Sequence, residues 1–430
     1  MKILILHNLG NPRYWRKNVA ELELALPHTL PNHQYLVHNA CLPLPDFVKR
    51  LSVDGIVLGP TFLCARYYTS HLDHTLREYG FIKEVKAWKI ALPQDDYDCS
   101  GILDRWMTDW GVNALYPVCS QHWDILYPRF IRSGGKMELS YTGFITRDLI
   151  RRSAHPRPHS TRGVDVFYRA SRLHPHFGRI GQIKSDIAEK FSQMFSPDGL
   201  SLDISTSRNA TIFGNKWLQT LENARFTLGT NSGSSIWDPE GKIRQKVKQF
   251  VATHPDASFS EVEKVCFPGE DGKYEFTALS PRNLEAGMLL TGQILVPGAY
   301  SGILHPWEHY VPISENCENH AEVLDAIRNL DLLERISSKC REQLLSRSDL
   351  RLDYHAQRLL QAISESIPSS DSSYSASFAK AVKRHTKFSN HVSKAIWFWQ
   401  EFKRTVHNHP VFGEFLKRIL TFTRSRFQAF

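Results

Sequence analysis

The chain has little of what marks secreted, membrane-spanning or zinc-binding proteins. Its 430 residues include only seven cysteines, an odd number, and they form no C-x-x-C pair. This pattern favours free thiols in a reducing compartment over a disulfide framework or a zinc site. No apolar run approaches the roughly 20 residues of a membrane span, and the opening run Met1–Leu6 is too short for a signal peptide. We therefore expect a cytoplasmic protein.

Excess charge is confined to one end of the chain. The formal net charge is +9, but between Asp371 and Phe430 eleven Lys and Arg residues stand against Asp371, Glu401 and Glu414. That stretch carries +8, so the rest of the chain is close to neutral. A near-neutral body argues against nucleic acid as a partner of the main domains.

The basic tail alternates cations with large apolar residues in two segments, Ala395–Arg404 and Phe412–Phe422. Basic and aromatic faces on one helix suit the interface of an anionic membrane, here the inner face of the plasma membrane. The alternative is a helix pair that packs on its own protein or on a partner. The polar segment Ser369–Ser375 separates this tail from the body.

Short apolar runs alternate with amphipathic stretches through most of the chain, which predicts parallel sheets with helices on both faces. We expect an α/β protein of two Rossmann-like doubly wound domains facing a cleft, plus a basic helical C-terminal tail. The expected divisions are 1–155, 163–348, a crossover helix at 349–368 and the tail at 369–430. The expected strands are Lys2–Leu6, Gln34–His38, Gly55–Leu58, Lys89–Leu92, Ala114–Pro117, Val164–Tyr168, Leu202–Ser205, Phe226–Gly229, Gln293–Val296 and Tyr310–Ile313. The polar, proline-containing segment Arg152–Arg162 is the expected linker.

The segment Phe276–Asn319 has the order of a phosphate and sugar pocket. Ser280 begins a short predicted helix that carries Arg282 and Glu285, and a Gly-rich loop with Tyr300 and Ser301 follows the next strand. A helix N-terminus and an Arg attract an anion, and Glu285 can accept hydrogen bonds from a ribose. Tyr300 and Ser301 are expected to contact the donor sugar or its phosphate. An ordinary βα unit with a surface Arg and Glu remains the alternative.

Two further polar loops follow predicted strands of the second domain. Arg169 ends the strand Val164–Tyr168, and Lys184 lies in the helix that G-R-I-G-Q-I-K opens, so both could hold a diphosphate. The loop after Phe226–Gly229 contains Asn231, Ser232 and Gly233, which offer donors to phosphate. A basic, solvated helix start would explain Lys184 equally well.

The segment Ser280–Ala286 followed by Gly292–Val296 resembles the R-x-x-E-A signature of glycosyltransferases with the GT-B fold, which use nucleotide sugars. The chain is also similar to bacterial surface-polysaccharide glycosyltransferases of the exostosin-like or family 1 type, with Q-D-D-Y at Gln94–Tyr97. The resemblance implies that Glu285 holds the ribose and that Arg169 and Lys184 hold the pyrophosphate. Many retaining members have a second Glu where this chain has Thr277, so the stereochemical outcome stays open.

The resemblance implies sugar transfer from a nucleotide-diphosphate donor to a glycan or glycolipid acceptor in cell-surface polysaccharide synthesis. No D-x-D follows a strand of the second domain, so we expect no metal and no obligatory cofactor. If the enzyme inverts, a base from the first domain would activate the acceptor, and the candidates are Asp96, with its neighbour Asp95, and His7. A loop residue or an acceptor contact is the alternative for His7. Capping of the next helix is the structural alternative for these two aspartates.

Three other functions fit parts of the pattern. A sugar-nucleotide epimerase shares the fold and would turn over donor without an acceptor. A non-catalytic scaffold of polysaccharide assembly would bind nucleotide weakly or not at all. A nucleic-acid module would bind through the tail and lose binding in high salt.

Overall fold

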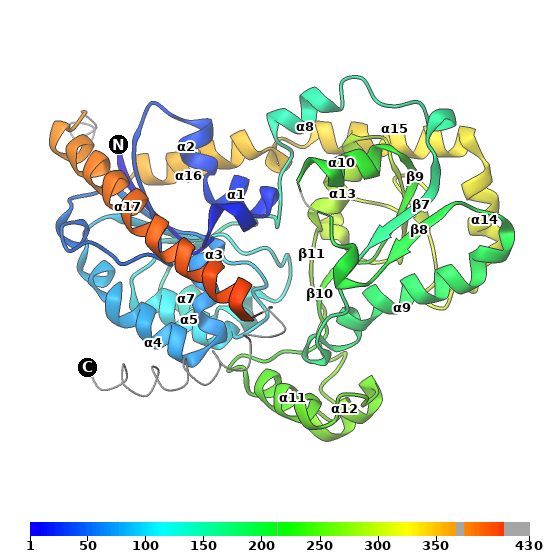
Figure 1. Cartoon of the computed structure of the whole chain (residues 1–430), viewed down its shortest axis with the longest axis horizontal. Coiled ribbons are helices and arrows are strands. Elements are labelled where there is room, and N and C mark those ends of the chain that lie inside the picture. Colours follow the sequence, from blue (N-terminus) through cyan, green and yellow to red (C-terminus); the bar gives the residue numbers. More distant parts are fainter. Residues whose placement is uncertain (213, 367–373, 408–430) are drawn as a thin grey trace.

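The fold is described from a computed structural model of the chain, which covers residues 1–212, 214–366 and 374–407. Side chains are described as far as residue 402. The predicted tail segment Phe412–Phe422 therefore lies outside the described residues. The molecule has a left and a right lobe in the view of Figure 1, each built around one parallel sheet.

The first lobe is a six-stranded parallel sheet in the order β2-β1-β3-β4-β5-β6. Strand β1, the second in this order, has four consecutive buried residues, Ile3–Leu6. A sheet covered on both faces needs such continuous apolar strands. The strands are β1 Lys2–His7, β2 Gln34–Asn39, β3 Gly55–Leu58, β4 Trp88–Ala91, β5 Ala114–Leu115 and β6 Lys136–Met137.

The second lobe is a five-stranded parallel sheet in the order β13-β12-β9-β7-β8. Its strands are β7 Val164–Arg169, β8 Leu202–Ser205, β9 Ala224–Gly229, β12 Gly292–Leu295 and β13 Val311–Pro312. Numbered from its own first strand, this sheet has the order 2-1-3-4-5, which is also the order of the first five strands of the first lobe. In such sheets ligands bind beyond the carboxyl ends of the strands where the order reverses, here at β7 and β9.

Helices cover both faces of each sheet (Figure 1). In the first lobe they are α1 Lys17–Glu23, α2 Ala25–Thr29, α3 Pro60–Leu63, α4 Thr69–Glu78, α5 Ser100–Asp109, α6 Trp123–Leu126 and α7 Pro128–Arg132. Helix α8 Arg147–Arg152 packs on the second lobe, where Leu149 shares a core with Leu218 and Leu284. In the second they are α9 Gly178–Phe195, α10 Asn215–Glu222, α11 Lys242–Thr253, α12 Phe259–Cys266, α13 Pro281–Met288, α14 His320–Arg328 and α15 Leu330–Ser346. Two helices follow, α16 Leu352–Ser364 and α17 Ala376–His407.

The sequence predicts most of these strands and helices closely. It misses a short strand, a helix and an antiparallel strand pair. The strands Gly55–Leu58 and Leu202–Ser205 have their expected bounds. The two-residue strand β6 and helix α12 were not expected. The antiparallel pair β10 Ser232–Ser234 and β11 Phe276–Ala278 was also missed. Its strands are three residues long and 42 residues apart, so no local pattern could reveal them.

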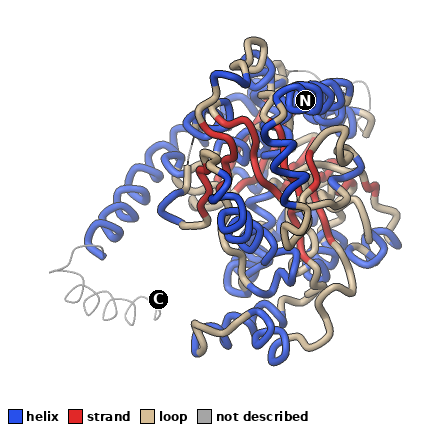
Figure 2. Tube along the Cα trace, turned by 90° about the vertical axis from the view of Figure 1, so that its right-hand side faces the viewer, coloured by secondary structure: helices blue, strands red, loops and turns tan. Residues whose placement is uncertain are grey.

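The last two helices return to the first lobe. Ile363 of α16 packs so closely on β3 that a Cβ at Gly55 would lie 2.7 Å from it. Helix α17 is anchored by Phe378 and by His385, whose ring nitrogen lies 3.0 Å from that of His38. Its far half extends away from the sheets (Figure 2), and near its end Glu401 accepts a hydrogen bond from the hydroxyl of Tyr14. No helix among the described residues is long and apolar enough to cross a membrane.

The expected linker Arg152–Arg162 is held firmly against the second lobe. Arg162 is 4% exposed and donates hydrogen bonds to the carbonyls of Arg157, Ala224 and Leu289. Burial lowers the pKa of this guanidinium to about 10, and no carboxylate pairs with it among the described residues. The connection between the lobes thus has a fixed course on the second lobe.

Candidate functional site

A cavity of about 390 Å³ lies between helix α1 of the first lobe and the second sheet's carboxyl edge. The first lobe contributes Arg16, Lys17 and Glu21. The second lobe contributes Arg169, Trp217, Ser280, Arg282 and Glu285. Four of the predicted donor-binding residues therefore line one cavity: Arg169, Ser280, Arg282 and Glu285.

Glu285 is held in place by Trp217 of helix α10. The indole Nε1–H of Trp217 donates to the Glu285 carboxylate at 2.7 Å. Burial raises the pKa of Glu285 to about 7, although Arg282, one helical turn earlier, opposes the shift. One carboxylate oxygen remains to accept from a hydroxyl group in the cavity.

Arg282 lies beside the cavity without a carboxylate partner among the described residues. Its guanidinium lies over the rings of Tyr168 at 4.8 Å and Trp217 at 5.3 Å, and it donates to the carbonyl of Arg169. Its Nε is buried and makes no hydrogen bond. The two rings and one carbonyl hold the guanidinium in place and leave it free to pair with an anion in the cavity.

Lys184 is a second such cation. Its ammonium group donates to the hydroxyl of Ser232 at 3.2 Å, and it forms no ion pair with a described carboxylate. Burial lowers the pKa of Lys184 to about 8; Asp95 raises it and Arg282 lowers it further. The charges of Arg282 and Lys184 therefore act on each other, and of the two Lys184 is the one that burial removes from water. The arrangement is suited to a multiply charged anion.

Arg169 lies at the same edge but already has partners. Its guanidinium is ion-paired with Asp203 at 2.6 Å and donates to the carbonyls of Ala210, Tyr168 and Asp203. The sequence pairs Arg169 with Lys184 for the pyrophosphate. The geometry favours Arg282 over Arg169 as the second cation beside Lys184, and Arg169 forms part of the cavity wall.

The N-terminus of α9, which the sequence offers to a diphosphate, is occupied by the protein itself. The amide of Arg179 donates to Asp271 at 3.1 Å and that of Ile180 to Ser235 at 3.2 Å. Gly178 has a φ of +68°, and a Cβ there would lie 2.3 Å from the Asp271 carboxylate. The glycine therefore serves this cap.

The remaining donor-binding candidates lie on loops that pack against each other. Asn231 accepts a hydrogen bond from the amide of Tyr300 at 3.2 Å. The Tyr300 hydroxyl is buried and donates to the carbonyl of Val296, so its side chain points into the core. The Ser301 hydroxyl is buried without a partner. Gly233 has a φ of +154°, and a Cβ there would lie 1.9 Å from the carbonyl oxygen of Phe276.

The two catalytic candidates of the first lobe, Asp96 and His7, are both buried. Asp96 is fully buried and accepts from the amides of Val118 and Cys119, and burial raises its pKa to about 7. His7 is 4% exposed, and burial lowers its pKa to about 4. Both side chains are enclosed by their own lobe.

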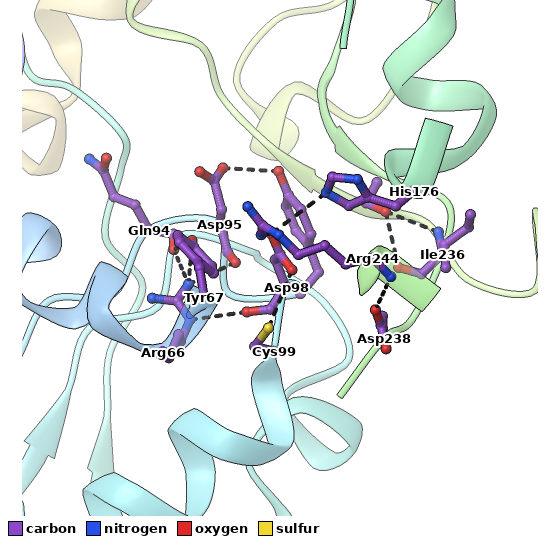
Figure 3. Close-up of polar contacts among 12 residues, drawn as sticks. Arg66, Tyr67, Gln94, Asp95, Asp98, Cys99, His176, Ile236, Asp238 and Arg244 are labelled. Atoms are coloured by element: carbon purple, nitrogen blue, oxygen red, sulfur yellow. Dashed lines mark hydrogen bonds and ion pairs between the residues drawn. The ribbon is translucent and has the colours of Figure 1, made fainter. Parts of the chain in front are cut away.

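Asp95, one residue before Asp96, is the carboxylate that faces outward (Figure 3). It is exposed, has a left-handed backbone with a φ of +48°, and accepts from the hydroxyl of Tyr97 at 2.9 Å. The buried Arg66 fixes this turn by donating to the carbonyls of Gln94 and Asp95. The negative charge of Asp95 raises the pKa of Lys184 in the opposite lobe. An exposed carboxylate with a left-handed backbone, held by a buried arginine, is a candidate for chemistry.

The segment Trp237–Gly241 docks the two lobes, a role that its sequence does not reveal. Pro239 accepts hydrogen bonds from the amides of Gly101 and Ile102 at the start of α5. Arg244 of α11 pairs with Asp98 of the first lobe, next to Asp238 and His176 (Figure 3). The contact joins the lobes beside Asp95, so the relative position of Asp95 and Lys184 is set by protein contacts.

The described residues contain no group of three or more His, Cys, Asp or Glu side chains placed to hold a metal ion. The seven cysteines are all free.

No family model matches the chain, and no curated protein matches it. Solved structures do. An alpha-glucosyltransferase in complex with UDP and a 13-mer DNA containing an HMU base has a TM-score of 0.53 at 12% identity, over 85% of this chain and 99% of that one. HepE of Anabaena in complex with UDP-glucose has a TM-score of 0.44 at 12% identity, over 85% and 100%. T4 phage beta-glucosyltransferase has a TM-score of 0.44 at 13% identity, and the match covers 84% of this chain and 99% of that one. The match at 0.53 shows the fold: the chain has the two-domain GT-B fold of glycosyltransferases.

Proposed function

We propose that the protein is a glycosyltransferase that moves a sugar from a nucleotide-diphosphate donor to an acceptor hydroxyl. One observation carries the proposal. Lys184 is largely removed from water, Arg282 lies beside it on the cavity wall, and neither forms an ion pair among the described residues. A diphosphate supplies the missing charge. The UDP or UDP-glucose in the fold's solved neighbours supports the choice of donor.

The assigned roles follow from position. The acceptor oxygen becomes bonded to the anomeric carbon and loses its proton, while the bond from that carbon to the diphosphate oxygen breaks and its electron pair leaves on the diphosphate. Lys184 and Arg282 stabilise the charge that develops there. Glu285, oriented by Trp217, accepts from the ribose hydroxyls. Asp95 replaces Asp96 as the residue that binds the acceptor hydroxyl and, if the configuration inverts, takes its proton.

Binding tests the proposal first. Titration calorimetry with UDP, GDP, ADP, TDP and CMP should find at least one nucleoside diphosphate that binds, with CMP weaker because it carries a single phosphate. Arg282→Ala should abolish that binding. Arg172→Ala, which removes an exposed arginine paired with Glu189, is the matched control and should bind normally. The proposal fails if no diphosphate binds, or if Arg282→Ala binds as well as the control.

Turnover separates this function from its two alternatives. A transferase consumes the donor rapidly only when the acceptor is present. A sugar-nucleotide epimerase would act on the donor alone, and a scaffold would consume none. Nuclear magnetic resonance of the donor, with and without acceptor, distinguishes these outcomes and also reports the anomer of the product.

The acceptor is proposed to be a glycan or glycolipid of the cell surface. The neighbour solved with a 13-mer DNA makes nucleic acid the competing acceptor. The near-neutral charge of residues 1–370 supports the glycan. Transfer assays should include both acceptor types, and sugar incorporated into DNA would reverse the assignment.

Helix α17 is proposed to hold the enzyme at an anionic membrane surface. Phe398, Trp399 and Phe402 are 69%, 57% and 47% exposed, and Lys394 is exposed beside them. Exposed aromatics with cations suit the headgroup region. Cosedimentation with phosphatidylglycerol vesicles should be lost in a variant with Phe398, Trp399 and Phe402 replaced by Ser. Equal binding to phosphatidylcholine vesicles would refute the electrostatic part of the proposal.

A further inference from the structure

Helix α1 brings a carboxylate of the first lobe into the cavity of the proposed donor site. Glu21 lines this cavity together with Lys17, one helical turn earlier, while Glu285 lines it from the second lobe. Residues four apart lie on the same face of a helix, so one face of α1 is turned toward the second lobe. Glu21 therefore faces the cavity from the lobe opposite Glu285.

The carboxylate of Glu21 has acceptor capacity that the protein leaves unused. Glu21 is half-buried and accepts no hydrogen bond from any described residue; its one ion pair there is with Lys17 at 3.8 Å. The Lys17 ammonium donates at 2.8 Å to Asp148 of α8 instead. Because α8 packs on the second lobe, this contact keeps α1, and with it Glu21, beside the cavity. An ionised carboxylate with no donor in reach is ready to accept from a ligand.

The two carboxylates also interact with each other. Burial raises the pKa of both groups, that of Glu285 to about 7, and the negative charge of Glu21 contributes to the increase at Glu285. Two like charges in one cavity repel each other unless a proton or a hydrogen-bond donor intervenes. Trp217 donates to one oxygen of Glu285, and Glu21 has no comparable donor among the described residues. The pair is suited to a neutral ligand group with two donors.

The diol of a ribose supplies two such donors. Its 2′- and 3′-hydroxyls are adjacent, and each can donate to a different carboxylate. Arg282 lies one helical turn before Glu285, so a diphosphate at Arg282 leaves the nucleoside for the part of the cavity next to the carboxylates. A phosphate group would be repelled there, whereas a hydroxyl group is not.

We propose that Glu21 is a second ribose-binding carboxylate, so that the donor's ribose is held between the two lobes and ribonucleotides are selected over deoxyribonucleotides. The inference rests on the proposed function and completes its donor site from the first lobe. The alternative is that Glu21 touches no ligand. Its negative charge would then weaken the binding of every nucleotide to the same degree.

Binding of deoxy compounds measures this contact without turnover. The probes are UDP, 2′-deoxy-UDP and 3′-deoxy-UDP, titrated by calorimetry; if GDP or ADP binds more tightly, its deoxy forms replace them. Glu21→Ala should bind UDP about tenfold more weakly, because a hydrogen bond to a carboxylate is lost. It should bind one of the two deoxy compounds as the unaltered protein does. Glu285→Gln, which keeps an acceptor for Trp217, should show the same pattern with the other deoxy compound.

Glu78→Ala is the matched control in the first lobe. The Glu78 side chain is 33% exposed, against 28% for Glu21, and it is also paired with a lysine, Lys49 at 2.9 Å. Glu78 lies outside the cavity, so this variant should bind all three compounds normally. The ratio of UDP affinity to deoxy-UDP affinity within one variant does not depend on how much of the protein is folded. A destabilised variant therefore still gives an answer.

The inference and the proposed function fail in different ways. Equal affinity of the unaltered protein for the three compounds would overturn the inference. So would an unchanged affinity ratio in Glu21→Ala. In both cases the proposed function stands as long as Arg282→Ala loses binding of all three. If Arg282→Ala binds them normally, the proposed function fails, and the inference fails with it.

Discussion

The two sheets share the strand order 2-1-3-4-5, but the cations near their carboxyl edges differ in how many hydrogen bonds they form. In the first lobe, Arg66 is 2% exposed and donates to the carbonyls of Leu63, Gln94, Asp95 and Asp98 and to the hydroxyl of Tyr67. In the second lobe, Lys184 has one hydroxyl partner and Arg282 one carbonyl. A satisfied buried cation fixes the backbone around it, whereas an unsatisfied one costs stability unless a ligand completes it.

One charged side chain at the first lobe's edge, the Asp95 carboxylate, is exposed. Substituting it should have the largest effect on catalysis. Asp95 is an exposed carboxylate whose backbone carbonyl accepts a hydrogen bond from Arg66. Asp95→Asn should lower kcat about 10²- to 10³-fold and leave the melting temperature unchanged. Asp96→Asn should lower the melting temperature and leave kcat unchanged, because the Asp96 carboxylate accepts hydrogen bonds from two backbone amides inside the lobe. Steady-state kinetics and thermal melts of both variants check this; a kcat loss confined to Asp96→Asn would restore the original assignment.

Removing the satisfied cation should damage the fold. Arg66→Met leaves four carbonyls without their donor and should lower the free energy of unfolding by about 3 kcal/mol. Urea unfolding measures it. Arg282→Met is the counterpart in the second lobe and should change the stability by less than about 1 kcal/mol. If the two variants lose equal stability, the contrast between the edges is wrong.

Removing the unsatisfied cation should instead damage ligand binding. Lys184→Met takes away a desolvated charge, so the apo protein should be as stable or more stable, while UDP binds about 100-fold more weakly, or about 2.7 kcal/mol. Lys190→Met on the same helix removes hydrogen bonds to Glu315 and Asn316. It should lower stability and spare UDP binding. Calorimetry with UDP and melts of the apo proteins give both numbers.

The same lysine predicts a pH dependence. Burial lowers its pKa to about 8, so the group is charged below that pH and neutral above it. The diphosphate binds the charged form, and UDP affinity should therefore be flat near pH 7 and fall about tenfold per pH unit well above pH 8. The ligand's own phosphate is fully ionised in this range. Lys184→Arg should flatten the profile; an unchanged profile in that variant would remove Lys184 from the site.

The sequence predicts the site's parts better than its arrangement. The strand ends and the short helix with Arg282 and Glu285 follow from local patterns, because each spans a few consecutive residues with a clear period. The partners of Arg169 do not, since Asp203 and Ala210 are 34 and 41 residues away. Nor does the capping of α9 by Asp271, which lies 92 residues from Arg179. Long-range pairing decides which cation is left free.

The amino-acid order by itself determined two parallel sheets, their helices and the basic end of the chain, because hydrophobic period and charge are written along the backbone. The tertiary structure alone decided which charges meet. It enclosed Asp96 and His7, turned Asp95 outward, paired Arg169 with Asp203 and left Lys184 and Arg282 without an ion pair in the part of the chain that the structure describes. Burial and pairing are properties of contacts between distant residues, and they set both the pKa of a group and its need for a ligand.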